Sequence, residues 1–244
     1  MSHLPILILV GRPASGKSEI IDYLLHADPD ERVHRFHIGL PDVLDDFPML
    51  WSWFEEDHIL SQVLKKPRLY TDDQGYFSET YFWQLLIRRL DLEYHKRLRD
   101  NPGYHAQKTA IIEFSRGSEH GGYGEAFNNL SDDILNQAVI VYVRVSFEES
   151  LRKNRRRYNP NKPDSILEHS LPDAKLERLY RLDGWDDLTK SDPSYLSIRN
   201  LRVPYALFEN SDDVTTGKPL QLADRLESVL DGLWAKKTSN NYTT

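Results

Sequence analysis

Stretches of hydrophobic residues with little alternation recur along the chain, and each is typical of a strand buried on both faces. Five such segments occupy residues 5–10, 33–38, 109–114, 138–145 and 201–208. Helical patterns lie between them, so the strands are expected to form a mainly parallel sheet with helices on both faces. The sequence therefore predicts an α/β three-layer sandwich with a five-stranded sheet.

Apolar residues at helical spacing predict helices over residues 17–26, 78–99, 147–157 and 219–234. Ser78 is a candidate cap for the second helix, and Pro219 suits the first turn of the last one. No linker divides the chain, which predicts one domain over residues 1–244. The aromatic-rich stretch of about 40–108 is expected to be a helical insertion over the sheet edge, with most of its aromatic rings in a core. The polar end, about 236–244, is expected to fray.

Composition narrows the possible functions. The chain has 244 residues, no cysteine and a formal charge of −7. Disulfides and thiolate chemistry are therefore excluded, and a broad basic face for an extended nucleic acid is not expected. No apolar run approaches the ~20 residues needed to span a bilayer, and the N-terminus lacks the features of a signal peptide. These features predict a soluble, cytoplasmic protein without a membrane partner.

One motif carries specific chemistry. Residues 11–18 read Gly-Arg-Pro-Ala-Ser-Gly-Lys-Ser and match every fixed position of the Walker A pattern, between a predicted strand and a predicted helix. In such a loop the backbone N–H groups of residues such as Ala14 and Ser15 surround phosphates, and Gly11 and Gly16 permit the tight turns. Lys17 would reach the terminal phosphates and Ser18 would help to hold Mg²⁺. The loop predicts binding of a nucleoside triphosphate, with ATP the expected one.

A triphosphate-binding loop does not specify the reaction. Asp72-Asp73-Gln74-Gly75 and Asn161-Lys162-Pro163-Asp164 match GTPase motifs, but neither follows a convincing central strand, so both are interpreted as loop coincidences. A remodelling ATPase would usually carry an apolar strand that ends in Asp or Asp-Glu. The third predicted strand instead runs into Glu113-Phe114-Ser115-Arg116.

Together these features resemble the P-loop kinase group, which includes nucleotide kinases and deoxynucleoside kinases. The Walker A loop opens the chain, Glu113 and Arg116 are similar to that group's carboxylate–arginine motifs, and strand 138–145 leads into an arginine cluster as that group's fourth strand leads into its lid. The resemblance implies phosphoryl transfer from ATP to a small acceptor. It does not cover residues 40–108 or 158–200, so it names no acceptor.

The arginine cluster is interpreted as part of a lid region of about 148–200. Arg152 and Arg156 lie one helical turn apart and are candidates for stabilising the transferred phosphoryl group, and Arg155 beside them is a candidate for binding the acceptor. A solvated helix end, where cations complement the helix dipole, is the alternative.

Glu113 ends a strand expected to lie beside the P-loop strand. Its carboxylate is a candidate, with Ser18, for holding Mg²⁺, or for accepting the proton of the acceptor hydroxyl. An ordinary structural ion pair is the alternative. Arg116 would face an anionic group of the acceptor.

Three further positions complete the predicted site. Asp42, Asp45 and Asp46 follow the second predicted strand, near the point where deoxynucleoside kinases carry a base. Asp42 is chosen as a substrate-binding candidate, although an exposed acidic loop is an open alternative. His120, in the glycine-rich stretch of residues 118–124, is a second substrate-binding candidate unless that stretch is a plain turn. Asn210 follows the fifth predicted strand, where related kinases pass the adenine ring.

The sequence thus predicts an ATP- and Mg²⁺-dependent kinase for a small molecule such as a nucleoside, a nucleotide or another metabolite. A nucleotide-responsive binding module with little turnover and, less favoured, a GTPase are the alternatives. No protein partner can be predicted.

Overall fold

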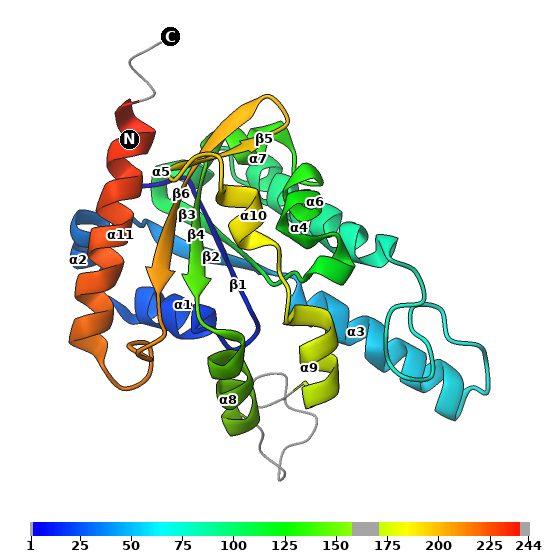
Figure 1. Cartoon of the computed structure of the whole chain (residues 1–244). Coiled ribbons are helices and arrows are strands. Elements are labelled where there is room, and N and C mark those ends of the chain that lie inside the picture. Colours follow the sequence, from blue (N-terminus) through cyan, green and yellow to red (C-terminus); the bar gives the residue numbers. More distant parts are fainter. Residues whose placement is uncertain (1, 158–170, 240–244) are drawn as a thin grey trace.

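The computed structural model describes residues 2–157 and 171–239. Its centre is a six-stranded sheet in the order β2-β3-β1-β4-β6-β5 (Figure 1). The strands are β1 (Ile6–Gly11), β2 (Leu40–Asp45), β3 (Lys108–Phe114), β4 (Ala138–Arg144), β5 (Tyr195–Ile198) and β6 (Leu201–Glu209). All neighbours pair in parallel except β5, which runs antiparallel to β6. The predicted α/β class and mainly parallel sheet are confirmed, but the strand number is six, not five.

Helices cover both faces of the sheet, which makes three layers. Their bounds are α1 (Lys17–His26), α2 (Pro29–Phe36), α3 (Phe47–His58), α4 (Tyr81–Asp100), α5 (Tyr104–Gln107), α6 (Gly122–Asn128), α7 (Asp132–Gln137), α8 (Phe147–Arg157), α9 (Asp173–Tyr180), α10 (Trp185–Thr189) and α11 (Pro219–Ser239), with a π-helical turn η1 (Ile59–Val63) and a 3₁₀ turn η2 (Ser118–His120). One hydrophobic core joins the sheet to α1, α2 and α11, and the other joins it to α4, α6 and α7.

One predicted strand is wrong. Residues 33–38 belong mostly to α2, which Asp28 caps by accepting hydrogen bonds from Asp30 N and Glu31 N. The second strand is instead β2, a short segment in which Pro41 and Asp42 interrupt the hydrophobic residues. Proline and charged residues are tolerated there because β2 is an edge strand that pairs only with β3.

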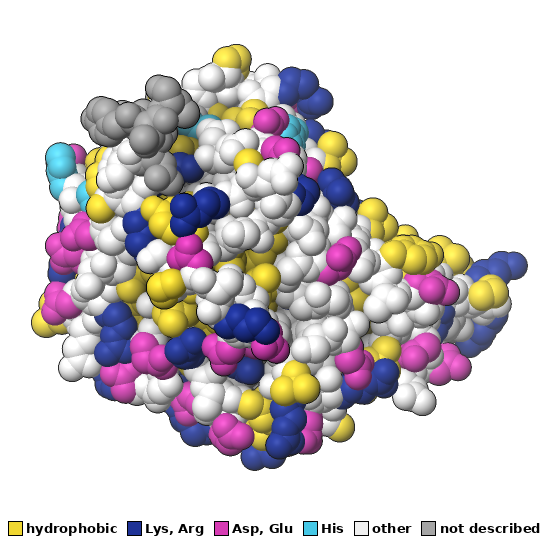
Figure 2. Space-filling model, turned by 45° about the horizontal axis from the view of Figure 1, so that its top comes forward, with side chains coloured by type: hydrophobic (Ala, Val, Ile, Leu, Met, Phe, Trp, Pro, Cys, Tyr) yellow, Lys and Arg dark blue, Asp and Glu magenta, His cyan; other side chains and the backbone are white. Residues whose placement is uncertain are grey.

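The segment between β2 and β3 departs from the sheet through α3, which extends away from the body, and returns through α4 (Figure 1). Trp53 of α3 and Phe82 and Leu86 of α4 form a small hydrophobic cluster that joins the two helices. Asp57 fixes the returning loop, since its carboxylate accepts hydrogen bonds from the backbone N–H groups of residues 69–71. On the face shown in Figure 2, basic and acidic side chains intermingle, and neither sign forms a continuous field.

Parallel strands bring their carboxyl ends to one edge of the sheet. The loop after β1, the acidic ends of β2 and β3, and α8 and α9 all lie at this edge (Figure 1). A site built there draws residues from segments far apart in sequence.

Candidate functional site

The loop after β1 has the shape of an anion cradle. Ser15 N donates to Arg12 O at 3.2 Å, and α1 begins directly after Gly16. Gly16 has φ of 110°, and a Cβ there would lie 2.5 Å from Asn210 Nδ2. Glycine is therefore required at this position by backbone conformation and by space.

Arg12 anchors this loop to the chain that follows α9. Its guanidinium donates to Tyr180 O, Val145 O and the Tyr142 hydroxyl, and its Nη1 lies 3.2 Å from Asp183 Oδ2. Because Arg12 is largely buried, this network fixes the cradle against the segment that leads out of α9.

Lys17 is buried inside the loop. Its Nζ donates to Gly11 O at 3.2 Å, Arg12 O at 3.1 Å and Ser115 Oγ at 2.9 Å, and it lies 3.8 Å from Glu113 Oε1. The lysine thus lies where the loop meets the end of β3. This follows from the pairing of β3 with β1, which confirms the prediction that the strand carrying Glu113 lies beside the P-loop strand.

Two carboxylates share this junction. Asp45 ends β2 directly opposite Glu113 in the β2–β3 register. Burial, followed by the charges of Glu113 and Asp46, raises the pKa of Asp45 to about 7. Burial also raises the pKa of Glu113 and lowers the pKa of Lys17. An excess of buried negative charge therefore faces the loop, which is the electrostatic setting that a cation would stabilise.

Asp46 and Arg116 form a buried ion pair behind this junction. Arg116 Nη1 lies 2.6 Å from Asp46 Oδ2, and both side chains are almost fully buried. The Arg116 guanidinium also packs against Trp83, with Cζ 5.2 Å from the ring centroid. Asp46 therefore neutralises Arg116 in a pair that forms part of the cavity wall. That Arg116 faces an anionic group of the acceptor stays a prediction.

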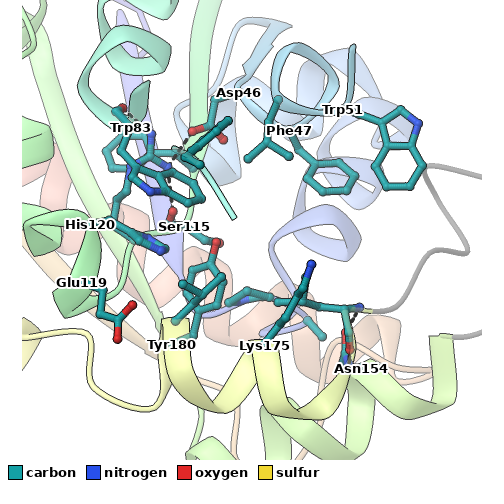
Figure 3. A pocket seen from close by; sticks show the side chains of 18 of the residues that line it. Asp46, Phe47, Trp51, Trp83, Ser115, Glu119, His120, Asn154, Lys175 and Tyr180 are labelled. Carbon is teal, nitrogen blue, oxygen red and sulfur yellow. Dashed lines mark hydrogen bonds and ion pairs between the residues drawn. The ribbon is translucent and has the colours of Figure 1, made fainter. Parts of the chain in front are cut away.

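These groups surround a cavity of about 620 Å³. The loop forms one side, and Asp45, Asp46, Glu113 and Ser115 form the end. Aromatic residues of the 47–83 segment and the inner face of α9 form the remaining walls (Figure 3); they include Phe47, Trp51, Phe54, Phe77, Trp83 and Tyr180. The volume is within the range of small-molecule sites.

The helix α9 is held closely over the cavity at both ends. Near its start, Lys175 Nζ donates to Gly75 O at 3.0 Å. In its last turn, Arg178 Cζ lies 4.2 Å from the Tyr76 ring centroid. Near its end, the backbone of Gly117 meets the helix so closely that a Cβ would lie 1.6 Å from Leu179 O. One side of the cavity is therefore bounded by α9, which lies within the predicted lid region of about 148–200 but contains none of the predicted site residues.

The predicted arginines are only partly in this region. Arg152 pairs with Glu149 and Asp213, and Arg155 pairs with Asp173; neither lines the cavity, and neither does Arg156. The predicted direct roles of these three side chains receive no support here, because Arg152 and Arg155 form ion pairs outside the cavity and Arg156 is exposed. Arg157, a member of the predicted arginine cluster with no separate predicted role, lines the cavity.

Two other predicted site residues do not line the cavity. Asp42 lies outside the cavity and pairs with Arg97 and Lys108. Asn210 is fully buried, and its amide donates to Ser15 O at 2.7 Å and Thr215 Oγ1 at 2.9 Å. The side chain supports the loop after β1 from behind. That an adenine ring passes this point, through backbone contacts, stays a prediction.

His120 does line the cavity. Its ring stacks on Trp83 with centroids 3.7 Å apart, and its Nδ1 accepts the Gly117 N–H at 3.1 Å. Burial, followed by the charge of Arg116, lowers the pKa of His120 to about 3. The residue is a neutral imidazole in a glycine-bounded turn, not part of a loose loop.

The GTPase motifs receive no support. Asp72 accepts hydrogen bonds from Gln74 N and Tyr76 N within its own turn, far in sequence from the end of β3. Residues 161–164 lie outside the described residues. Across the described ranges 2–157 and 171–239, no helix is long and apolar enough to cross a membrane.

The donor set fits Mg²⁺ held jointly with a triphosphate. Ser18, Asp45 and Glu113 offer hard oxygen atoms beside the loop, which is the chemistry that Mg²⁺ prefers. Within the described part of the chain, no cluster of three or more His, Cys, Asp or Glu side chains forms a complete cage.

Comparison with known proteins finds similarity only at the level of solved structures. No model of a known protein family matches the sequence, and no curated protein matches it. Among solved structures, a sugar kinase from Janibacter sp. is 12% identical, with 95% of this chain and 97% of that chain covered and a TM-score of 0.44. Shikimate kinase from Acinetobacter baumannii, in complex with shikimate, is 14% identical, with 97% and 96% covered and a TM-score of 0.45.

Proposed function

We propose that this chain is an ATP- and Mg²⁺-dependent phosphotransferase that acts on a hydroxyl group of a small molecule. One observation carries the proposal: the buried Lys17 of the phosphate loop meets the carboxylates of Asp45 and Glu113 at the closed end of a cavity of about 620 Å³. Phosphoryl transfer needs a phosphate cradle, neutralising charge and a base within one enclosed space.

The cradle residues have separate roles. The backbone N–H groups of the loop and the start of α1 would surround the β-phosphate, and Lys17 would move from the loop carbonyls to the phosphate oxygens. Ser18 and Glu113 would hold Mg²⁺, which neutralises charge on the triphosphate when bound. Arg157 would add positive charge from the α8 side, where it already interacts electrostatically with Lys17 and Glu113.

Asp45 is the preferred base. The acceptor oxygen would bond to the γ-phosphorus as the bond to the bridging oxygen of ADP breaks, and the hydroxyl proton would pass to the Asp45 carboxylate. A pKa of about 7 suits a group that takes up a proton near neutral pH. Asp45 replaces Asp42, which is outside the cavity.

The test is ADP release from ATP and MgCl₂ against a panel of sugars, polyols, nucleosides, nucleotides and small acids. Stimulation by one chemical class, lost in Lys17→Ala, supports the proposal. Tight ATP binding with only slow, acceptor-independent hydrolysis would instead favour a nucleotide-responsive binding module. A preference for GTP would favour the GTPase alternative.

A further inference from the structure

His120 presents a hydrogen-bond donor with no acceptor. Because Nδ1 accepts the Gly117 N–H, the proton of the neutral ring is on Nε2. His120 is 2% exposed, and Nε2 has no hydrogen-bond partner within the part of the chain that the structure describes. An unsatisfied buried donor costs free energy, so a ligand oxygen at this position would be strongly favoured.

The charged side chains around His120 are already neutralised. Arg116 pairs with Asp46, as described above, and Arg178 lies 3.1 Å from Glu119. Two further cations line the cavity but lie away from His120. Arg157 interacts with the Lys17–Glu113 junction, and Lys175, which Figure 3 shows on the opposite side of the cavity from His120, donates to Gly75 O. A carboxylate or phosphate on the acceptor would lose its hydration near His120 without gaining a free cation.

The neighbouring walls are aromatic. His120 lies between Trp83 and Tyr180, whose ring is 5.1 Å from the His120 ring and nearly perpendicular to it (Figure 3). Burial raises the pKa of Tyr180, so its hydroxyl stays protonated. Flat apolar faces with a few neutral donors suit a molecule that has both a C–H face and several hydroxyl groups.

We infer that the acceptor is an uncharged alcohol of carbohydrate type, and that one of its oxygen atoms accepts a hydrogen bond from His120 Nε2. This inference rests on the phosphotransferase function proposed above. It makes His120 a specificity residue, because its fixed neutral donor selects acceptors that carry a hydroxyl group. Acidic acceptors are disfavoured because the arginines beside His120 are already paired with carboxylates. A site built to bond a hydroxyl discriminates strongly against an analogue that lacks it.

Matched pairs that differ in charge test the acceptor class. Full-length protein, ATP and MgCl₂ are assayed with glucose and glucuronate, glycerol and glycerate, and adenosine and AMP. The neutral member of the productive pair is expected to give a kcat/KM at least about tenfold higher, of the size that one lost or gained polar contact produces. A preference for the acid overturns the inference but leaves the phosphotransferase intact. Absence of turnover with every acceptor overturns the phosphotransferase function. In that case calorimetric titration of the same pairs, with a non-hydrolysable ATP analogue present, tests the inference alone. Binding of the neutral members supports it, and binding of the acids, or of neither, overturns it.

Substitution of His120 tests the contact. His120→Phe keeps a ring against Trp83 but removes the donor, and His120→Gln retains an N–H near the position of Nε2. Acceptor KM is expected to rise about tenfold or more in His120→Phe and less in His120→Gln, with the KM for ATP unchanged. Among deoxy analogues of the acceptor, the one with the lowest kcat/KM in the wild type lacks the hydroxyl that bonds to His120. For this analogue, kcat/KM should not fall further in His120→Phe. An additive loss, or equal effects of the two variants, would show a merely structural role and overturn the assignment; circular dichroism and thermal unfolding confirm that each variant is folded.

Discussion

Replacing Asp45 by asparagine should stabilise the protein while it disables the reaction. The asparagine amide retains an oxygen for the Phe47 N–H, which donates to Asp45 Oδ1 at 2.9 Å. The substitution removes one of the crowded carboxylates that meet near Lys17. The predicted gain arises because the native state must hold this carboxylate where burial, Glu113 and Asp46 all disfavour its charge.

The pH dependence follows from the direction of that pKa change. The folded pKa of about 7 lies above the ordinary value of 3.8, so the folded state binds more protons than the unfolded state between these values. The contribution of Asp45 to the free energy of unfolding therefore falls as pH rises from about 4 to about 7 and is constant above that range. At about 1.4 kcal/mol for each pH unit, the full interval corresponds to about 4 kcal/mol. Relaxation of neighbouring carboxylates reduces this, so a gain of about 2–4 kcal/mol is expected at pH 8.

Urea denaturation of the nucleotide-free protein at pH 5 to 8, with EDTA present, measures the difference. Asp45→Asn should exceed the wild type increasingly as pH rises, with an unchanged urea dependence. Asp42→Asn is the matched control: it replaces a carboxylate that is paired outside the cavity, so it should not stabilise. A variant that is no more stable than the wild type at pH 8, or whose advantage does not depend on pH, would refute the reasoning. Turnover should fall at least about 100-fold, as expected when a positioned base is lost.

Three further predictions concern the phosphate loop. Lys17→Ala should reduce kcat/KM for ATP by at least about 100-fold, measured by ADP release, since it removes the cation at the terminal phosphates; an unchanged rate and ATP affinity would contradict the proposed cradle. Arg12→Ala should destabilise by about 3–5 kcal/mol in urea, because Asp183 loses its buried partner; a loss under about 1 kcal/mol would mean that the network around Arg12 is not an anchor. Asn210→Ala should cost about 1–3 kcal/mol by leaving Ser15 O and Thr215 without a donor, and the ratio of ATP to GTP turnover should stay the same. A changed ratio would restore the adenine-reading role.

The hydrophobic pattern predicted four of the six strands because β1, β3, β4 and β6 carry dense apolar runs. It failed at β2, where an edge strand bears Pro41 and aspartates, and at α2, where Asp28 and Pro29 start a helix through an apolar run that includes Val33 and Phe36. Local capping outweighed strand propensity there. The four-residue β5 has too short a pattern to be distinguished from a loop.

The candidate site was predicted best where a fixed spacing encodes it. Lys17, Ser18 and Glu113 lie together because a loop and two adjacent parallel strands enforce it. The arginines of α8 share one short sequence, but only the direction of each side chain decides which lines the cavity. The sequence therefore predicts the cluster that contains Arg157 without distinguishing Arg157 from its neighbours. The roles of Arg116 and Asn210 depended on Asp46 and Ser15, which are distant in sequence, so no local signal could have assigned them.

The close approach of Gly117 to Leu179 O gives this position an influence on a ligand that it never touches. Its backbone has φ of −117°, which any residue can adopt, so space alone demands glycine. Introducing even one methyl group would displace the end of α9 outward and carry Tyr180 with it. A library at residue 117 is therefore a route to widening the range of acceptors while the reacting groups stay unaltered.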